Sequence, residues 1–338
     1  MATALRTRPG GTASIRPRRR VGWFDAVALL YGAATAVSLA AWLAFGDTWW
    51  TLLVNAATFW WALPALPLVL VALLLRRRLA VVALGLPAVL FVWSFGGLFV
   101  GSAPAAAGDL RVASYNTYVR APDTSHVVSL VRDEHPDVLL VQEVFPSTAA
   151  AIREGVADHL PHSWFGEPGR VGGVGVVSRH PIVEVRPIPQ VDVHSRPTAV
   201  VVLDVDGRRL QVVAVHLTSP CPLCGESVVE RQRFEAEQRR AEMDAIVSVL
   251  DDDAPAVVGG DFNSDRRADP YRMLAGAGFR DPQLEAGSGP GFTWPATGVG
   301  AVRIDWVLVR GLAPAAAWVD PPRASDHRPV VADLAWED

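Results

Sequence analysis

Five short motifs in the C-terminal two-thirds of the chain carry residue types that act in the chemistry of phosphate esters. In chain order they are Ser114-Tyr115-Asn116, Val141-Gln142-Glu143, Val215-His216-Leu217, Gly260-Asp261-Phe262-Asn263 and Ser325-Asp326-His327. They lie at the ends of apolar runs of the kind that form strands. A sheet that delivers carboxylates, amides and imidazoles to one edge makes a hard-cation site beside a proton-transfer site. The pattern therefore predicts metal-dependent chemistry on phosphate esters.

Two carboxylates are predicted to serve a metal ion. Glu143 follows the apolar run 139–141 and Gln142. An ionised carboxylate directly after a buried strand costs free energy unless a partner lies beside it, and a divalent cation is such a partner. Gln142 is predicted to hold Glu143 in place by a hydrogen bond. Asp326, just before the last apolar strand, is a candidate for binding metal or water. An exposed loop glutamate is the alternative for Glu143.

A second group of residues is predicted to handle water and phosphate. In the segment 259–263, two glycines let the backbone turn sharply and leave room for a ligand. Asp261 and Asn263 point to the same side if the segment stays extended, so the carboxylate can activate water while the amide holds a phosphoryl group. Asn116, which ends the first strand, is a further phosphate-binding candidate. A turn-forming role is the alternative for both segments.

Two histidines are predicted to provide charge and proton transfer. His327 is a candidate donor to a transition-state oxyanion and needs an acceptor on its other ring nitrogen. Asp305 is the predicted acceptor, and this pairing would raise the pKa of His327. His216 ends another apolar run and is predicted to protonate a leaving group or contact phosphate. The other histidines are predicted to be solvated: His126, His135, His159, His162, His180 and His194.

Charge is distributed unevenly along the chain. Of its 31 basic and 35 acidic residues, nine arginines and only two aspartates precede Asp109. Residues 109–338 therefore hold 22 basic and 33 acidic residues, a formal charge of −11. A domain that binds duplex DNA without sequence preference is usually basic. This balance argues against nucleic acid as the natural substrate, although bound metal would offset part of the negative charge.

The N-terminal third is predicted to be a membrane anchor. Three apolar stretches, Phe24–Phe45, Thr51–Leu75 and Leu79–Val100, are each near or above the ~20 residues that span a bilayer as a helix. Arginines precede the first stretch and follow the second, whereas the loop between these two has none. The positive-inside rule then places the N-terminus in the cytoplasm and the chain after the third stretch outside it. Three buried helices of a soluble domain are the alternative.

The predicted organisation has four parts. Residues 1–20 form an Arg-rich cytoplasmic tail, 21–100 the three-helix anchor, 101–108 a small-residue linker, and 109–338 the outer domain. In that domain helices are predicted over Ser125–Glu134, Ser147–His159 and Glu226–Leu250. Strands are predicted over Leu110–Tyr115, Val138–Val141, Val174–Ser178, Ile182–Arg186, Ala199–Asp204, Leu210–His216, Ala256–Gly259, Ile304–Val309 and Pro329–Leu334. This alternation indicates two packed sheets with helices on their outer faces.

The chain has two cysteines, Cys221 and Cys224. A disulfide is predicted if the domain lies outside the cytoplasm. Free thiols and a metal or redox site are the alternatives, because a single such pair is weak evidence for zinc.

Taken together, the motifs of residues 109–338 resemble those of the endonuclease/exonuclease/phosphatase superfamily, which comprises deoxyribonuclease-like metal-dependent phosphoesterases, and in particular its bacterial membrane-anchored members. The resemblance implies an α+β fold, a four-layer αββα sandwich of two packed mixed β-sheets flanked by helices, here preceded by three transmembrane helices. It places the site at one edge of the sheets. It also implies Mg²⁺ or Mn²⁺ near Glu143.

The resemblance also implies a role for each motif residue. Asp261 would position or activate the attacking water, Asp305 would orient His327, and His327 would stabilise the pentacovalent charge. His216 matches the histidine of the deoxyribonuclease-like branch. Tyr118 departs from the pattern, since some family nucleases carry an acidic residue there. The residues assigned to phosphate are Asn116 and Asn263, and Asp326 is assigned to the metal or water network.

The predicted function is hydrolysis of phosphodiester or phosphomonoester bonds outside the cytoplasm by a multi-pass protein of the cell membrane. The predicted substrate is a lipid headgroup, a nucleotide or nucleic acid, and no obligate protein partner is evident. Within the enzyme class the alternative is an extracytoplasmic nuclease. From another class, the alternative is a catalytically silent binding module displayed on the membrane. A pseudoenzyme is expected to have lost a key residue, whereas the main set is present here.

Overall fold

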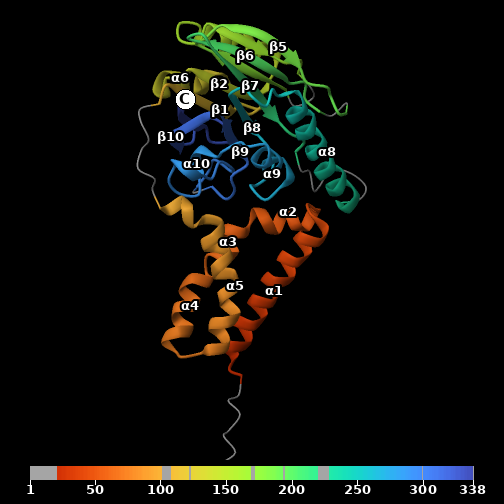
Figure 1. Cartoon of the computed structure of the whole chain (residues 1–338), viewed down its shortest axis with the longest axis vertical. Helices are drawn as coiled ribbons and strands as arrows, with labels where there is room; N and C mark the ends of the chain where they lie inside the picture. The colour runs from red at the N-terminus through yellow and green to blue at the C-terminus, as the bar shows by residue number, and fades with distance from the viewer. Residues whose placement is uncertain are drawn as a thin grey trace, which may run out of the picture.

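Two mixed β-sheets lie face to face with helices on their outer sides and form the C-terminal part of the molecule, above a bundle of apolar helices (Figure 1). The computed structural model describes residues 21–100, 108–121, 123–168, 172–192, 195–219, 228–298 and 300–337. The predicted tail 1–20, the Cys221–Cys224 pair, His194 and all but the end of the linker lie outside the described residues.

The first sheet has the strand order β10-β11-β1-β2-β4-β3. In it β1 and β2 are parallel and the other neighbours are antiparallel. Helices α6 (Ser125–Glu134) and α7 (Pro146–Val156) cover its outer face through an apolar cluster. The strands are β1 (Leu110–Asn116), β2 (Val138–Val144), β3 (His162–Phe165), β4 (Gly173–Ser178), β10 (Leu312–Val319) and β11 (Val330–Trp336).

The second sheet has the order β5-β6-β7-β8-β9, with β7 and β8 parallel. Helices α8 (Val228–Val249) and α9 (Asp269–Gly276) cover its outer face, and the short α10 (Pro282–Glu285) lies beside β10. The four-layer αββα prediction is thus confirmed. The strands are β5 (Ile182–Pro187), β6 (Ala199–Val205), β7 (Arg208–His216), β8 (Ala256–Asp261) and β9 (Asp305–Arg310).

The core between the sheets consists of alternate residues of each strand. Leu110 and Val112 of β1 belong to the same buried cluster as Val212 and Ala214 of β7 in the other sheet. Gly259 of β8 belongs to the same inward row, and a Cβ there would come within 2.7 Å of a Leu140 side-chain atom from the other sheet. Because side chains alternate with a period of two, this apolar parity fixes which later residues also point inward.

The N-terminal part is a bundle of helices with few charges. Its elements are α1 (Trp23–Phe45), α2 (Trp49–Ala56), α3 (Thr58–Ala62), α4 (Ala65–Leu74), α5 (Arg78–Phe95) and a 3₁₀ turn η1 (Gly96–Phe99). Small residues let the helices approach closely, since a Cβ on Gly32 of α1 would lie 2.3 Å from the Ala83 carbonyl oxygen of α5. By length and composition, the segments Trp23–Phe45 and Arg78–Phe99 are able to cross a membrane.

The second apolar stretch, predicted to span a bilayer as a helix, is not one continuous helix in the structure. It is broken into α2, α3 and α4, and the parts Trp50–Ala56 and Thr58–Leu74 are bent by 63° relative to each other, so they make a third span only if counted together. At the bend, the Val54 carbonyl accepts from the Thr58 hydroxyl at 3.1 Å and from the Trp61 indole at 2.9 Å. A backbone carbonyl without a hydrogen-bond donor costs free energy in apolar surroundings, and these two side chains supply donors to the Val54 carbonyl.

The anchor is docked onto the sandwich through polar and aromatic contacts. Arg267 donates to the hydroxyls of Thr58 and Ser94, and Arg266 donates to the Ser94 carbonyl at 2.7 Å. The Trp60 indole donates to the Ala301 carbonyl at 2.7 Å and stacks on the Phe292 ring. The bundle and the sandwich therefore pack against each other and are not connected by the linker alone.

The tightest backbone contact beneath the site gives a stability prediction. A Cβ on Gly260, whose φ is +143°, would lie 1.9 Å from the Val215 carbonyl oxygen on the parallel strand β7. Gly260→Ala should therefore destabilise the domain by roughly 3 kcal/mol and lower its unfolding midpoint by several degrees. The matched control is Gly276→Ala, since a Cβ there meets no atom within 4 Å. Thermal unfolding followed by tryptophan fluorescence compares the two, and equal midpoints would contradict the prediction.

Candidate active site

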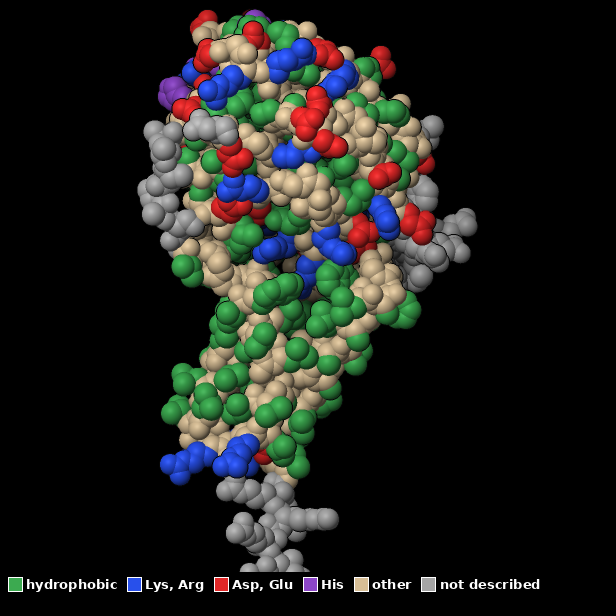
Figure 2. Space-filling view, viewed as in Figure 1, with side chains coloured by type: hydrophobic (Ala, Val, Ile, Leu, Met, Phe, Trp, Pro, Cys, Tyr) green, Lys and Arg blue, Asp and Glu red, His purple; other side chains and the backbone are tan. Residues whose placement is uncertain are grey.

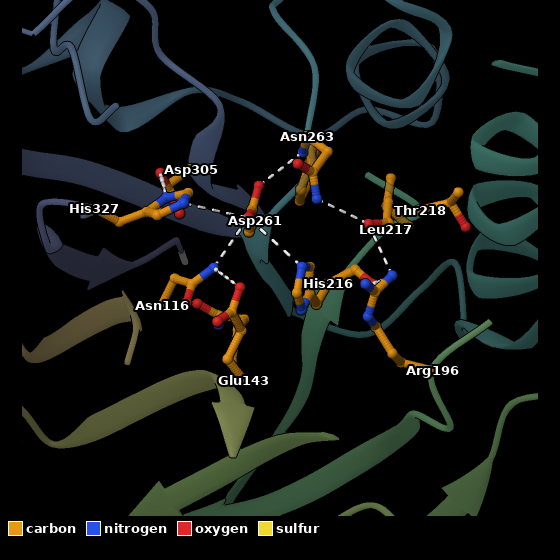
Figure 3. Close-up of polar contacts among 12 residues, drawn as sticks. Asn116, Glu143, Arg196, His216, Leu217, Thr218, Asp261, Asn263, Asp305 and His327 are labelled. Carbon is orange, nitrogen blue, oxygen red and sulfur yellow. Dashed lines mark hydrogen bonds and ion pairs between the residues drawn. The ribbon is translucent and has the colours of Figure 1, made fainter. Parts of the chain in front are cut away.

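The inward-facing rows of both sheets end in polar residues at one edge. In the second sheet His216 pairs with Asp261, and Asp261 pairs with Asp305, so three neighbouring strands end at the same level. In the first sheet Asn116 lies opposite Gln142 at the end of the parallel pair β1–β2. Figure 3 shows Asp261 at the centre of these side chains. The polar residues at the ends of the apolar runs, which were predicted to share one edge, therefore lie together at one edge of the two sheets.

The Asp261 carboxylate is the hub of the site. Its Oδ2 accepts from Asn116 Nδ2 at 3.1 Å and lies 3.7 Å from His216 Nε2 and 3.8 Å from His327 Nε2. Its Oδ1 accepts from the Asn263 backbone N–H at 2.8 Å. Burial, together with the nearby Asp305 charge, raises the pKa of Asp261 to about 7. A carboxylate with such a pKa is suited to exchange protons near neutral pH.

Glu143 is aimed at Asp261 by an irregularity in β2. The pairing of β2 with β4 shifts between Gln142 and Val144, and Glu143 has a left-handed φ of 62°. Such a bulge redirects one side chain without disturbing the alternation before it. The Glu143 carboxylate accepts from Asn116 Nδ2 at 3.2 Å and from the Val119 backbone N–H at 2.7 Å. Gln142, predicted to hold Glu143, instead donates to the Ser114 hydroxyl at 3.3 Å.

His327 and Asp305 form the predicted imidazole–carboxylate pair. His327 Nδ1 lies 2.8 Å from Asp305 Oδ2, and both side chains are buried. Burial alone would lower the pKa of His327, but the charges of Asp305 and Asp261 outweigh burial and raise it to about 10. The ring is therefore an imidazolium at neutral pH, with Nδ1 as donor to Asp305 and Nε2 directed toward Asp261.

His216 is in the opposite protonation state. Burial, with smaller contributions from Arg196 and His327, holds the pKa of His216 well below its usual value. A neutral imidazole has no proton to spare for a leaving group, so this environment favours a hydrogen-bonding role over the acid role predicted from sequence.

Arg196 is a cation at the site that no sequence motif had marked as a candidate. Its guanidinium donates to the Leu217 carbonyl at 3.1 Å and to the His216 carbonyl at 3.3 Å. It belongs to a polar loop between β5 and β6, where an arginine is ordinarily a solvated residue. Only the fold brings it beside the carboxylates.

Most of the predicted site residues line one cavity of about 630 Å³. Asn116 and Asp305 lie beneath this lining, bonded to the groups that face the cavity. Asn263, beside Asp261, donates to the Leu217 carbonyl at 2.9 Å. The lining residues from the sandwich include Glu143, Arg196, His216, Asp261, Asn263, Asp326 and His327.

The carboxylates in this cavity fit a divalent cation. Glu143, Asp261 and Asp326 offer oxygen ligands, which Mg²⁺ and Mn²⁺ prefer. Burial, and after it the Asp305 charge, disfavours the ionised form of Asp261 and raises its pKa, and a bound cation would offset both effects. Ligand atoms of Asp261, Asp305 and His327 also lie within 4.8 Å of one another. In that group the imidazolium is bonded to Asp305, and a protonated ring does not bind metal.

One histidine outside the site contradicts its prediction. His126 is buried, not solvated, with Nε2 3.2 Å from the Thr117 carbonyl oxygen. Burial lowers the pKa of His126, so it is a core residue beneath β1 that packs edge-on against Tyr115.

Comparison with known proteins agrees with this geometry. A family model described as the Endonuclease/Exonuclease/phosphatase family matches residues 113–327. The solved endonuclease/exonuclease/phosphatase from Beutenbergia cavernae DSM 12333 is 25% identical, with a TM-score of 0.51, over 68% of this chain and 72% of that one. No curated protein sequence matches the chain significantly.

Two further solved structures share the fold. A functionally unknown conserved protein from Enterococcus faecalis V583 is 18% identical with a TM-score of 0.52, over 68% of this chain and 100% of that one. An endonuclease/exonuclease/phosphatase from Bacteroides vulgatus is 19% identical with a TM-score of 0.52, over 68% of this chain and 99% of that one.

The charge state of His327 is open to a direct test. Replacing Asp305 by Asn removes the hydrogen-bonded charge that raises the pKa of His327 to about 10, so this pKa should fall by at least ~1 unit. A histidine-selective NMR titration measures it. Asp206→Asn, in the exposed β6–β7 turn, is the control. An unchanged titration of His327 in the Asp305 variant would show that the pair does not set its charge.

Proposed function

The chain belongs to the Endonuclease/Exonuclease/phosphatase family, and from this membership we propose that it is a divalent-metal-dependent phosphoric ester hydrolase held on a membrane. Members of the family generally hydrolyse phosphoester bonds. The observation that carries the proposal is the meeting, at one cavity, of the buried Asp261 carboxylate, whose pKa is raised to about 7, and the His327 imidazole, which is paired with Asp305 and has a pKa raised to about 10.

In this mechanism Asp261 and His327 have complementary roles. Asp261 takes a proton from the water that attacks phosphorus, since its pKa of about 7 leaves a useful fraction deprotonated at neutral pH. The His327 imidazolium donates to a phosphoryl oxygen as negative charge develops there. Asp305 keeps that ring protonated and fixed in orientation. Asn116 holds Asp261 and Glu143 in a defined relation by donating to both.

Glu143 and Asp326 would hold the divalent cation, with Asp261 beside them. When bound, the cation supplies positive charge to the phosphoryl oxygens. Arg196 and Asn263, which face the same cavity, are proposed to orient the phosphate group. Phosphoryl transfer depends mainly on such positioning and charge stabilisation.

We place the sandwich outside the cytoplasm. Figure 2 shows an anchor surface dominated by hydrophobic side chains, with basic groups at the end remote from the sandwich. Arg76 and Arg77 lie in the turn between α4 and α5, and Arg78 is the first residue of α5. The positive-inside rule assigns this end to the cytoplasm, which puts the sandwich on the opposite side.

An experiment on metal and carboxylate tests the hydrolase proposal. With Mg²⁺ or Mn²⁺ the full chain in detergent should hydrolyse an aryl phosphodiester, and a chelator should abolish the activity reversibly. Asp261→Asn should lower kcat about a thousandfold, since the proton acceptor for the attacking water and a carboxylate beside the proposed cation are both lost. Asp206→Asn should leave activity unchanged. If hydrolysis of aryl diester, phospholipid and plasmid DNA is the same in the wild type, Asp261→Asn and His327→Ala preparations, the activity does not come from this site. A catalytically silent binding module would then be the better description.

The orientation has its own test. Protease added to intact spheroplasts should remove the sandwich, because residues 109–338 are predicted to be outside. Detection uses antibodies against tags at each end of the chain. Protection of the sandwich, with cleavage of the N-terminal tag, would reverse the topology.

A further inference from the structure

The cavity at the catalytic edge has two unlike walls. Polar residues of the sandwich form one, and apolar residues of the anchor form the other. Leu53 and Trp60 have exposed fractions of 59% and 42%, so their surfaces are free to contact a ligand. Trp294 of the sandwich, 41% exposed, continues the apolar surface. The anchor residues that line the cavity are Leu52, Leu53, Ala56, Ala57 and Trp60.

The apolar wall is held in place by the sandwich itself. It exists because the second apolar stretch bends by 63° at Ala57, which lays α2 across the ends of the other helices beneath the sandwich (Figure 1). Arg267 donates to Thr58 beside the bend, and Trp60 donates to Ala301. Domain residues far away in the sequence thus fix these helices against the catalytic edge.

The wall also lies where a bilayer surface is expected. Its helix α2 contacts α1 and its helix α3 contacts α5, and α1 and α5 are long and apolar enough to cross a membrane. Tryptophans occur on either side of the bend at Trp50, Trp60 and Trp61. Indole rings concentrate at the level of lipid headgroups because one edge is polar and the body is apolar. With the anchor in a bilayer as proposed above, the cavity would open at headgroup depth.

We propose that the anchor supplies half of the substrate site, and that the substrate is a membrane lipid whose phosphoester reaches the catalytic residues while its hydrocarbon lies on the α2–α3 wall. This inference rests on the proposed hydrolase function and adds the substrate class. A cavity of about 630 Å³ accommodates a headgroup and the first carbons of its chains. The remaining hydrocarbon stays in the bilayer.

The same features disfavour a polynucleotide. A groove for a nucleic-acid strand carries cations along the backbone and aromatic platforms for bases. Here the wall facing the catalytic carboxylates is aliphatic at Leu52, Leu53, Ala56 and Ala57, and Trp60, which also lines the cavity, is already stacked on Phe292. The surrounding residues 109–338 carry a formal charge of −11.

The reaction is a hydrolysis that consumes one water for each lipid. The water oxygen bonds to phosphorus, one phosphorus–oxygen ester bond breaks, and the departing oxygen takes up a proton. The products are an alcohol and a phosphate ester or free phosphate, of which the more apolar one remains in the bilayer.

Two substitutions in the wall test the proposal in the full chain. Leu53→Ala removes hydrocarbon contact, and Ala57→Phe fills the space beside the bend. Matched controls are Leu70→Ala in α4, with an exposed fraction of 58% against 59% for Leu53, and Ala36→Phe on the exposed side of α1. Leu70 and Ala36 are not among the residues that line the cavity.

Each variant is assayed with Mg²⁺ on two kinds of substrate. One is a set of mixed micelles that contain dioleoyl phosphatidylglycerol, phosphatidylethanolamine or phosphatidate, and the other is the soluble bis(p-nitrophenyl) phosphate. We expect both wall variants to raise the KM for lipid about tenfold, while the aryl diester is hydrolysed within about twofold of the wild-type rate. Unchanged aryl diesterase activity also shows that the variants are folded.

Three results would overturn the proposal. The chain hydrolyses the aryl diester or plasmid DNA but none of the lipids; the wall variants behave like their controls; or they slow both substrate kinds equally. A different result, no hydrolysis of any phosphoester with Mg²⁺ or Mn²⁺, defeats the hydrolase function itself. The two failures are therefore distinguishable.

Discussion

A buried carboxylate, that of Asp261, is the constraint around which the catalytic edge is arranged. Removing such a group from water costs free energy unless donors and positive charge surround it. Asn116 from the other sheet, the backbone N–H of Asn263 and the His327 imidazolium provide these partners. Gly260 leaves the backbone room to bring the carboxylate against β7. The compensation is partial, since the pKa of Asp261 remains raised to about 7. A carboxylate with this pKa exchanges protons near neutral pH, which suits Asp261 to proton transfer.

Much of this edge followed from the sequence because the strands obey a simple alternation. Asn116, His216 and Asp261 continue inward-facing apolar rows, so the ends of those runs identified them. Asp305 was found as the first residue of such a run, and its partner was inferred from chemistry alone. Arg196 was missed because its loop has no periodic pattern. The edge strand β3 was missed because its four residues are all only half-buried, and His126 was misjudged because a polar-looking helix start turned out to be covered.

The bend in the anchor shows the limit of local reasoning more clearly. Hydropathy identified residues 51–75 as one apolar stretch long enough to span a membrane, but it carries no information about the 63° bend within it. What stabilises the bend are donors outside the local pattern, namely Trp61 to the Val54 carbonyl and Arg267, some two hundred positions later, to Thr58. A propensity scale carries no information about such contacts. The sheet register, by contrast, depends on burial along whole strands, and this burial is visible in the sequence as an apolar residue at every second position.

The docking of Arg266 and Arg267 on Ser94 has a consequence for access. A catalytic domain joined only by a flexible linker samples many orientations and meets substrates from every direction. Here these contacts fix the sandwich against the helices, with the catalytic edge facing α2 and α3. With the helices in a bilayer as proposed, the catalytic edge would face the membrane surface, and substrates that diffuse laterally in the bilayer would reach it more readily than large polymers from solution.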